Sequence, residues 1–409
     1  MPKKTIIPLR RFHRSLLLLA RLSLPSAMMI LTAVIASLNI SVIYYIKIPH
    51  AISLRFDRKT SRMEREMASR PRISDLAKTA GVSVATVDRV LNGRHKVREE
   101  TARRVYEAAN AIGYHAMGLI RQRVFEDLPQ YRLGFSFQRP TQGFYQNFAR
   151  EIEIACNACT FARIVPQIEF INTQTSAAMT AMLHQLSARN RALAVVAPDY
   201  PATTSAVEDL KARNIPLFCL LSDFAVDVRQ GYIGLNNMKV GRTAAWMIAR
   251  GAKRPGKVAI FVGSHRFHGH ELREAGFRSF FREKGQDFEV LDTLVNHDTA
   301  EITHEATANL LAQHADLVGL YVAGGGMEGA ISAIREEGYA GKVQLIVNEL
   351  TPESKAGLAE EVVTMAINTP LALLCRELVS LMVSSIEKGE DAVPSQTFLP
   401  FDIFTPENI

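Results

Sequence analysis

The sequence predicts a small all-α domain followed by a larger α/β part made of two lobes. Helical periodicity broken by a glycine-marked tight turn fills residues 70–116. From residue 131 onward, short apolar runs alternate with helical stretches. The length of 409 residues suits two or three folded units, and 47% hydrophobic residues supply a large core.

Charge is distributed unevenly along the chain, whose formal total is +7. Residues 1–66 hold 12 Lys and Arg against 3 Asp and Glu, residues 67–125 hold 11 against 5, and residues 126–409 hold 25 against 33. A basic segment ahead of an acidic body favours a nucleic-acid reader joined to a part that avoids DNA. Four cysteines are too few for a disulfide framework, so we expect a reducing cytoplasm.

Residues 1–66 form a hydrophobic N-terminal extension. Within it, residues 22–46 are 25 residues without a formal charge, more than the roughly 20 needed to cross a bilayer. Basic residues flank both sides and give no orientation, and the run is long for a signal-peptide apolar region. Two interpretations stay open: a membrane anchor with the rest in the cytoplasm, or a natural start at Met63 or Met67. We favour the later start.

The domain at 67–116 is expected to contain three short helices. Ser74 is the expected cap of the first helix, and Gly81 is its expected end because glycine tolerates positive φ. Ser83 is the expected cap of the second helix, residues 84–91, which Asn92 and Gly93 terminate. A third helix is expected from about residue 98 to 111. Helices joined by such a turn form a helix-turn-helix, which places its second helix in the major groove of DNA.

The expected DNA contacts are Ser83, Val84, Ala85, Thr86, Arg89 and Asn92. Val84 and Ala85 are expected to face outward and to contact thymine methyl groups. Arg89 is expected to reach a guanine edge or a phosphate. Ser83, Thr86 and Asn92 are placed to donate hydrogen bonds to phosphates, aided by the helix N-terminus.

The stretch DLAKTAGVSVATVDRVLNGRHKVREETARRVYEAANAIGYH closely resembles the DNA-binding domain of the lactose/galactose-repressor (LacI) family. Its AGVS-x-x-TV-x-RVLNG core is highly specific. The resemblance implies a transcriptional regulator, a repressor, that binds a double-stranded operator as a homodimer or tetramer. Asp88 stands where the family commonly has serine, and we expect it to repel phosphate and narrow the choice of site.

Residues 117–130 occupy the position of the family's hinge, which inserts a leucine into the minor groove. Leu119 or Ile120 is the expected apolar wedge, and packing against the sensor is the alternative role for both. The segment lacks the family's usual asparagine near its start.

Residues 131–409 are expected to form parallel sheets covered by helices on both faces. The expected strands are residues 132–137, 192–197, 216–220, 257–262, 317–322 and 343–347. Expected helices include residues 148–159, 177–188, 205–212, 240–250 and 328–337. This part resembles the type I periplasmic sugar-binding-protein fold, through GYIGLNNMKVGRTAAWMIAR at the crossover between lobes and the R-x-x-GF motif at 273–277. The resemblance places lobe 1 at about 131–233 and 349–388, and lobe 2 at about 234–348 and 389–409.

Ligands of doubly wound folds sit at the carboxyl ends of strands, here in the cleft between lobes. The expected effector contacts are Phe144, Tyr145, Asp199, Asp223, Asn237, Arg273, Glu349 and Asn368. Aromatic faces suit the C–H surface of a sugar ring, and carboxylates, amides and a guanidinium suit hydroxyls. Together with the resemblance to sugar-binding proteins, this chemistry leads us to expect a sugar, polyol or cyclitol. A glycine run, residues 324–326, stands where many sensors of the family carry an Asn-Asp pair, so backbone N–H groups are expected to approach the ligand there.

The remaining motifs do not predict catalysis, a metal or a cofactor. Cys156 and Cys159 form a lone C-x-x-C that favours a structural role, and the histidine-rich loop 264–270 favours ligand or solvent contact over metal. No nucleophile–base signature appears in the sequence, so we expect a regulator and not an enzyme. The alternative function, from another class of protein, is that of an exported solute-binding protein. Such a protein would not need a helix-turn-helix.

Overall fold

The structure is a computed structural model that describes residues 71–92, 97–116, 118–120 and 128–409. The extension 1–66, with its apolar run 22–46 and the two candidate starts, lies outside the described residues. Much of the expected hinge, residues 117 and 121–127, also lies outside them. Among the described residues, no helix combines the length and the apolar composition that a membrane span requires.

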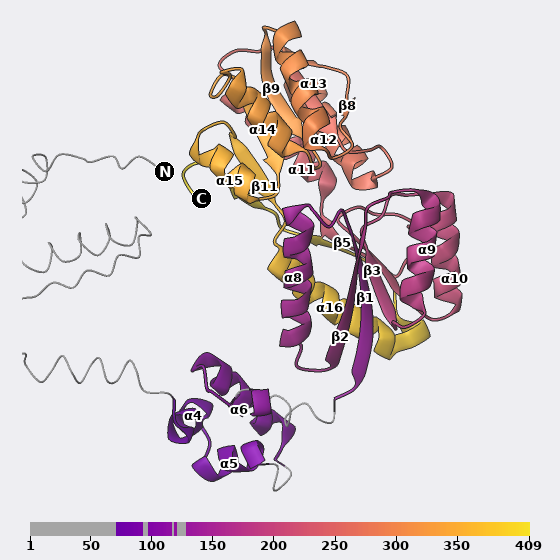
Figure 1. Ribbon diagram of the computed structural model, residues 1–409, viewed down its shortest axis with the longest axis vertical. Coiled ribbons are helices and arrows are strands. Elements are labelled where there is room, and N and C mark those ends of the chain that lie inside the picture. Colours follow the sequence, from indigo (N-terminus) through magenta and orange to yellow (C-terminus); the bar gives the residue numbers. More distant parts are fainter. Residues whose placement is uncertain (1–70, 93–96, 117, 121–127) are drawn as a thin grey trace, which may run out of the picture. The chain divides into compact units, whose positions relative to one another are not determined.

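The N-terminal domain is built from α4 (Ile73–Ala80), α5 (Val84–Asn92) and α6 (Glu99–Ala111), which enclose a small apolar core (Figure 1). Its fully buried members include Leu76, Val87, Val105 and Ala109. Their spacing is helical, so each helix turns one apolar stripe inward. The expectation that Ser74 caps α4 is wrong. The helix begins at Ile73, because the Asp75 carboxylate accepts a hydrogen bond of 2.8 Å from the Arg72 backbone N–H.

Two sheets form the sensor (Figure 1). The first sheet is wholly parallel and has the order β12-β5-β4-β3-β1-β2. Its strands are β1 (Gln130–Gln138), β2 (Arg163–Ile171), β3 (Ala192–Val195), β4 (Leu217–Leu220), β5 (Gly231–Leu235) and β12 (Ser395–Leu399). Helices α8 (Gly143–Ala158), α9 (Ser176–Ser187), α10 (Pro201–Ala212) and α16 (Leu371–Lys388) pack on it.

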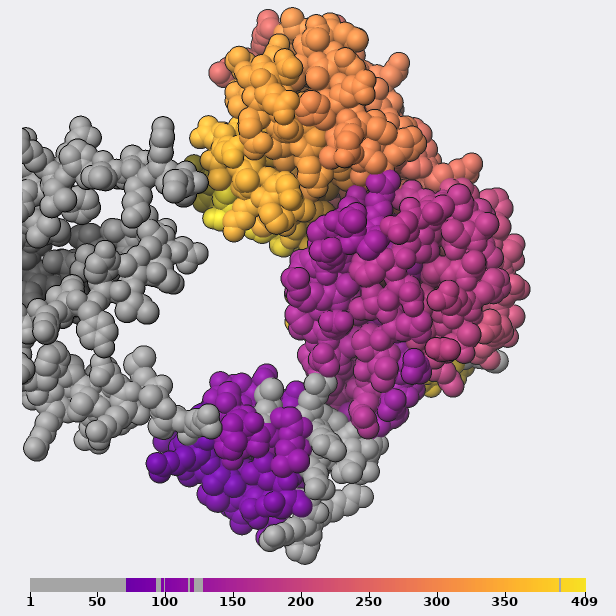
Figure 2. Space-filling model, viewed as in Figure 1, coloured from indigo at the N-terminus to yellow at the C-terminus, as the bar shows by residue number. Residues whose placement is uncertain are grey.

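The second sheet has the order β13-β11-β10-β9-β6-β7, with β8 paired to β6 and β13 antiparallel. Its strands are β6 (Lys257–Val262), β7 (Glu289–Val290), β8 (Leu294–Val295), β9 (Leu317–Val322), β10 (Gln344–Asn348), β11 (Met365–Asn368) and β13 (Asp402–Phe404). Its helices are α11 (Asn237–Gly251), α12 (His268–Lys284), α13 (Ala300–Gln313), α14 (Met327–Glu336) and α15 (Pro352–Ala359). Figure 2 shows the two lobes as rounded bodies, one largely magenta and one largely orange.

Side chains of each central strand alternate between two apolar layers, which confirms sheets covered on both faces. In β3, Ala192 and Ala194 join the core that contains α8 and α16, whereas Leu193 and Val195 join the core that contains α9 and α10. Such two-sided burial explains why these strands are continuous apolar runs in the sequence. β2 was not among the expected strands. It is an edge strand with Pro166 in its middle and half-buried residues throughout, so it lacks that signal.

The lobe boundaries differ from the predicted ones. β10, α15 and β11 place residues 349–368 in the second lobe, and β12 places residues 395–399 in the first. The chain thus crosses between the sheets after β5, after β11 and after β12. Sequence pattern could not place these strands, because an apolar run does not reveal which sheet edge it joins. β12 pairs with β5 in parallel from Ser395 opposite Gly231.

Candidate DNA-reading helix and effector cleft

The turn between α4 and α5 is held by side chains on both sides of Gly81. Gly81 has φ +63° and its N–H donates to the carbonyls of α4, as expected for a helix end. The Ser83 hydroxyl accepts a hydrogen bond of 3.1 Å from the Thr86 N–H, which confirms Ser83 as the cap of α5. The Ser83 and Thr86 hydroxyls also lie 2.8 Å apart. The first turn of α5 is therefore fixed before any ligand binds.

The exposed face of α5 carries the apolar and basic side chains expected to read DNA. Val84 is 47% exposed, and Ala85 and Arg89 are also exposed, while Val87 and Val90 are buried on the opposite face. An exposed valine beside an exposed alanine has no folding role, so these side chains are free for apolar contact with a base edge. Thr86 is half-buried beneath them.

Asp88 and Asn92 interact with each other on α5. The Asn92 side-chain amide donates a hydrogen bond of 2.7 Å to Asp88 Oδ1. This pairing occupies one donor of Asn92, which we expected to bond phosphate. Asp88 is thus positioned by Asn92 one turn further along the helix.

Arg104 of α6 holds the turn and was missed by sequence reasoning. Its Nη2 donates to the carbonyl oxygens of Ala80 at 2.7 Å and Gly81 at 3.1 Å. Two of the carbonyls left over at the end of α4 are satisfied in this way. A Cβ at Gly81 would lie 2.9 Å from the same nitrogen, so a larger residue there would displace Arg104 in addition to straining the positive φ. The 23-residue separation of Arg104 from Gly81 hides this contact in the sequence.

The structure assigns different surroundings to the two candidate wedge residues. Ile120 is fully buried in the core of the helical domain, whereas Leu119 is 45% exposed. Only one of the two is therefore available for an apolar contact outside the domain. Leu119 remains our prediction for the wedge.

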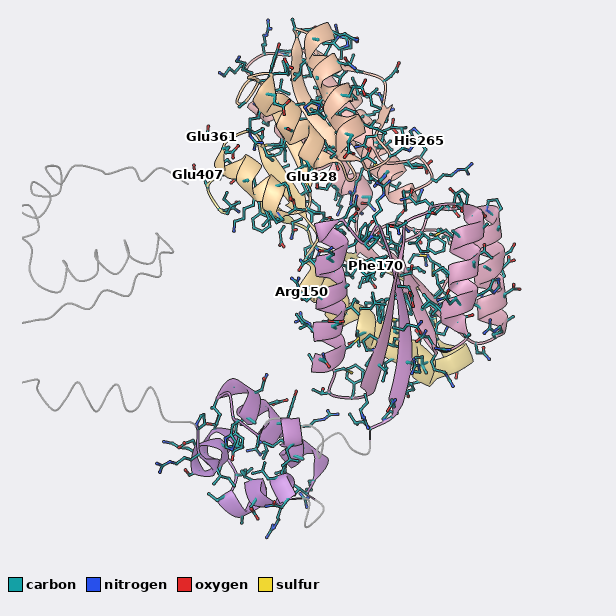
Figure 3. All side chains as sticks on the ribbon, in the orientation of Figure 1. Arg150, Phe170, His265, Glu328, Glu361 and Glu407 are labelled. Carbon is teal, nitrogen blue, oxygen red and sulfur yellow. The ribbon has the colours of Figure 1, made fainter. Side chains whose placement is uncertain are left out.

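A cavity of about 550 Å³ lies between the lobes at the carboxyl ends of their strands. We call it the effector cleft. Its lining includes three of the expected contacts, Phe144, Arg273 and Glu349, together with Arg139, Gln142, Ser222, His270, Asp298, Glu301, Glu328 and Glu353. Figure 3 shows Glu328 on the side of the second lobe that faces the first, and Glu361 on its outer side.

Arg273 is the best-positioned cation of the cleft. It is 7% exposed, its Nε donates to Asn237 Oδ1 at 2.8 Å, and its Nη1 donates to the Ala323 carbonyl at 2.6 Å. No described residue accepts a hydrogen bond from its Nη2. The fixed guanidinium thus has donors left for oxygens in the cleft.

Other expected contacts turn inward and do not line the cleft. Asn237 positions Arg273 and donates to the Leu221 carbonyl at 3.1 Å. Asp223 forms a buried, two-bond ion pair with Arg229. Asn368 accepts from the Leu350 N–H at 3.1 Å and so ties β11 to the end of β10. Strand ends place polar residues near the cleft, but only packing decides which of them face it.

Asp199 and Tyr145 lie beside the cleft. Asp199 is exposed, and its backbone N–H donates 2.8 Å to the Arg266 carbonyl in the loop before α12. The Tyr145 ring packs on Phe137 and Phe144. Burial raises the pKa of Tyr145, and the nearby Asp298 and Glu349 carboxylates raise it further. Its hydroxyl therefore stays protonated and close to the acidic side of the cleft.

The glycine run after β9 makes room for a carboxylate. Gly325 N–H donates 2.7 Å to Asp298 Oδ1, and the Gly325 carbonyl accepts 2.8 Å from the Asn296 amide. Gly324 and Gly325 line the cleft, and the Gly325 N–H, which we expected to approach the ligand, bonds Asp298 instead. Asp298 has φ +54°, a conformation that aspartate tolerates and that no sequence pattern signals here.

Contacts across the cleft tie the lobes together. Arg139 and Gln142, which follow β1, donate to the backbone carbonyls of His297 and Asp298 in the second lobe. The Gly269 N–H at the start of α12 donates 3.0 Å to the Ser222 hydroxyl in the first lobe. Arg139 and Gln142 lie between a predicted strand end and Phe144, so the strand-end rule could have included them.

Buried ionisable groups of the cleft are shifted toward their neutral forms. Burial raises the pKa of Glu349, against hydrogen bonds from Thr369 and the charge of Arg273. Burial, and then Glu353 and Asp298, raise the pKa of Glu328. Burial lowers the pKa of His270, although Asp298 opposes that change. Within the described residues, no cluster of three or more His, Cys, Asp or Glu could hold a metal ion.

Comparison with known families finds a match for the helical N-terminal domain and another for the two-lobed part. Residues 72–116 match the family described as bacterial regulatory proteins, lacI family, and residues 133–391 match the family described as periplasmic binding protein domain. The transcriptional regulator GalS of Salmonella typhimurium is 21% identical over 335 residues, covering 80% of this chain and 94% of the relative. The sucrose operon repressor of Streptococcus mutans is 23% identical over 213 residues, covering 52% and 62%.

Solved structures share the fold of the sensor. A periplasmic solute-binding protein from Actinobacillus succinogenes with bound D-allose has a TM-score of 0.62 at 19% identity, covering 68% of this chain and 98% of that one. A solute-binding protein from Burkholderia graminis in complex with D-arabinose has a TM-score of 0.63 at 18% identity, covering 69% and 97%.

Proposed function

This chain belongs to the periplasmic binding protein domain family and carries ahead of that domain the helix-turn-helix of the lacI family of bacterial regulatory proteins, and from that premise we propose that it represses transcription under the control of a sugar-like effector. The observation that carries this proposal is the joint presence of an exposed reading face on α5 and a cavity between two lobes. The named relatives are transcriptional regulators, one of them a sucrose operon repressor.

On the DNA side, Val84, Ala85 and Arg89 read base edges in the major groove, and Ser83 and Thr86 bond phosphates. Asn92 contributes to phosphate binding through the donor that Asp88 leaves free. Leu119 enters the minor groove. Two copies bind the half-sites of a near-palindromic operator, so the repressor acts as a homodimer or as a pair of dimers. It acts in the cytoplasm, where the operator is.

On the effector side, Phe144 stacks on a sugar ring, and Arg273 Nη2 donates to neighbouring hydroxyl oxygens. Ligand bound in the effector cleft contacts both lobes and changes the population of arrangements in which Arg139 and Gln142 bridge them. An effector that prefers one arrangement shifts the fraction of dimers competent for DNA. Tyr145, Glu349 and Asp199 shape the cleft around the ligand.

Two other functions would use parts of the same chain. The sensor's likeness to solute-binding proteins favours an exported binding protein as second candidate, but such a protein has no use for α5. A membrane-anchored form of the regulator depends on residues 22–46, which lie outside the described residues. Fractionation of the native protein, with mass spectrometry of its N-terminal peptide, tests the anchored form.

Selection from random and genomic duplexes tests the main proposal. We expect the full chain to enrich a near-palindromic site and to lose affinity steeply with salt. A carbohydrate panel added to the selected duplex should change that affinity. The proposal is wrong if the protein binds every duplex equally, with and without the panel.

A further inference from the structure

Carboxylates outnumber cations in the effector cleft. Its lining contains Asp298, Glu301, Glu328, Glu349 and Glu353 against Arg139 and Arg273. The imidazole of His270 does not offset this excess, since burial favours its neutral form. Glu301, Glu328 and Glu353 each lie in the first turn of a helix, α13, α14 and α15, whose amino ends face the cleft. The helix dipole favours negative charge at these positions, although burial opposes it at Glu328.

Each of the two arginines already bonds oxygens of the protein, although Arg273 Nη2 does not. Arg139 donates to two backbone carbonyls across the cleft, and Arg273 lies beside Glu349, whose oxygens both accept from Thr369. Among the described residues, no lysine or arginine forms an ion pair with Asp298, Glu328 or Glu353. Asp298, Glu328 and Glu353 therefore line the cavity without an ion-pair partner among the described residues.

Close packing against glycine residues and backbone hydrogen bonds fix the position of the Asp298 carboxylate in this wall. A Cβ on Gly263 would lie 2.0 Å from Asp298 Oδ1, and one on Gly324 would lie 2.5 Å from the same atom. The Gly325 N–H donates to Oδ1, and Asn296 Oδ1 accepts 3.0 Å from the Asp298 N–H. Backbone in the left-handed region, held by neighbours in this way, is typical of functional sites. Among the described residues, none donates a hydrogen bond to Asp298 Oδ2.

We propose that the effector is a polyhydroxylated molecule bearing a protonated amine, an amino sugar or aminocyclitol, whose ammonium group binds Asp298 and Glu328. This inference rests on the proposed function and names the ligand class of the same cleft. Arg273, which is 7% exposed and lines the cleft, takes a hydroxyl oxygen of the same molecule through Nη2. An ammonium group offers three donors on a compact charge, which suits carboxylates from the Asp298 loop and from the first turn of α14.

Electrostatics favours this class over its neutral and anionic counterparts. The hydroxyls of a neutral sugar can donate hydrogen bonds to these carboxylates, but a neutral sugar brings no opposite charge when the lobes close and remove their water. A sugar phosphate or sugar acid adds a further negative charge to the same wall. An ammonium group instead relieves the repulsion that Glu328, Glu353 and Asp298 exert on one another.

Ligands matched in stereochemistry test the inference. Calorimetry on the full chain would compare glucose, galactose, mannose and an inositol with their monoamino counterparts and with the sugar acids and 6-phosphates. We expect an amine-bearing member to bind about tenfold or more tightly than its neutral match, and the anionic members not to bind. Asp298→Asn and Glu328→Gln should each remove most of that preference. Glu337→Gln, an exposed carboxylate at the other end of α14, should leave it intact.

The outcomes separate the inference from the proposed function. Neutral sugars that bind as well as their amines overturn the inference, while the sugar-controlled regulator stands. Binding of an anionic member overturns it in the same way. A protein that selects an operator but binds no member of the panel overturns the inference and leaves DNA recognition in place. A protein that selects no operator overturns the proposed function itself.

Discussion

Replacing Arg104 by methionine should destabilise the DNA-reading domain without touching its reading face. The change keeps much of the aliphatic stem and removes the nitrogen that bonds the Ala80 and Gly81 carbonyls at 2.7 and 3.1 Å. A net hydrogen bond contributes about 0.5–1.5 kcal/mol, and bonds from charged groups contribute more. Arg104 is exposed, so solvent screens part of that gain, and we expect a loss of about 1–2 kcal/mol for the pair.

Hydrogen exchange measured by mass spectrometry reports this loss locally. Peptides covering the buried side of α5, around Val87 and Val90, should lose about 5- to 30-fold in protection, since 1.4 kcal/mol is a factor of ten. Sensor peptides should not change. Arg98→Met is the matched control, because Arg98 is exposed at the N-cap of α6 and makes no side-chain cap hydrogen bond. Equal protection in Arg104→Met and the parent protein would refute the assigned role of Arg104.

Four further substitutions test the division of labour and the electrostatics. Arg89→Ala should weaken operator binding by about 1–3 kcal/mol per half-site in an anisotropy titration, with an unchanged unfolding curve, because Arg89 is exposed. Arg273→Ala should abolish the effector response and leave operator affinity unchanged, and equal damage to both activities by these two variants would contradict the division. Leu119→Ala should reduce operator bending measured by energy transfer between duplex ends, and an unaltered bend would exclude a wedge. Because burial and nearby carboxylates raise the pKa of Glu328, the folded chain retains a proton there that the unfolded chain releases near pH 4.3. The free energy of unfolding should therefore fall as pH rises from about 4.3 through that raised pKa. Glu328→Gln should remove this part of the pH dependence of urea unfolding. If the free energies of unfolding of the variant and the parent protein changed in parallel with pH, the assignment to Glu328 would be wrong.

Local sequence signals were sufficient for the helix-turn-helix. Gly81 and Ser83 act through contacts within a few residues, and the 3.6-residue spacing of apolar side chains identifies the buried stripe of each helix. The same holds for the central strands of the sensor, because burial on both faces leaves a continuous apolar run. Edge strands such as β2, which are half-buried, lack that signal.

The sequence by itself determined the three helices of the N-terminal domain, the central strands of the sensor and the α/β layering, and it predicted the outward face of α5 and a cleft at the strand ends. Tertiary structure alone decided which strand-end residues face the cleft: Arg273 and Glu349 do, whereas Asp223 pairs with Arg229 and Asn237 supports Arg273. It also brought Asp298 onto the glycine run and assigned β12 to the first lobe. The physical reason is the separation along the chain between the residues that interact. Helix caps and apolar periodicity depend on neighbours along the chain, but the orientation of a polar side chain depends on partners tens of residues away.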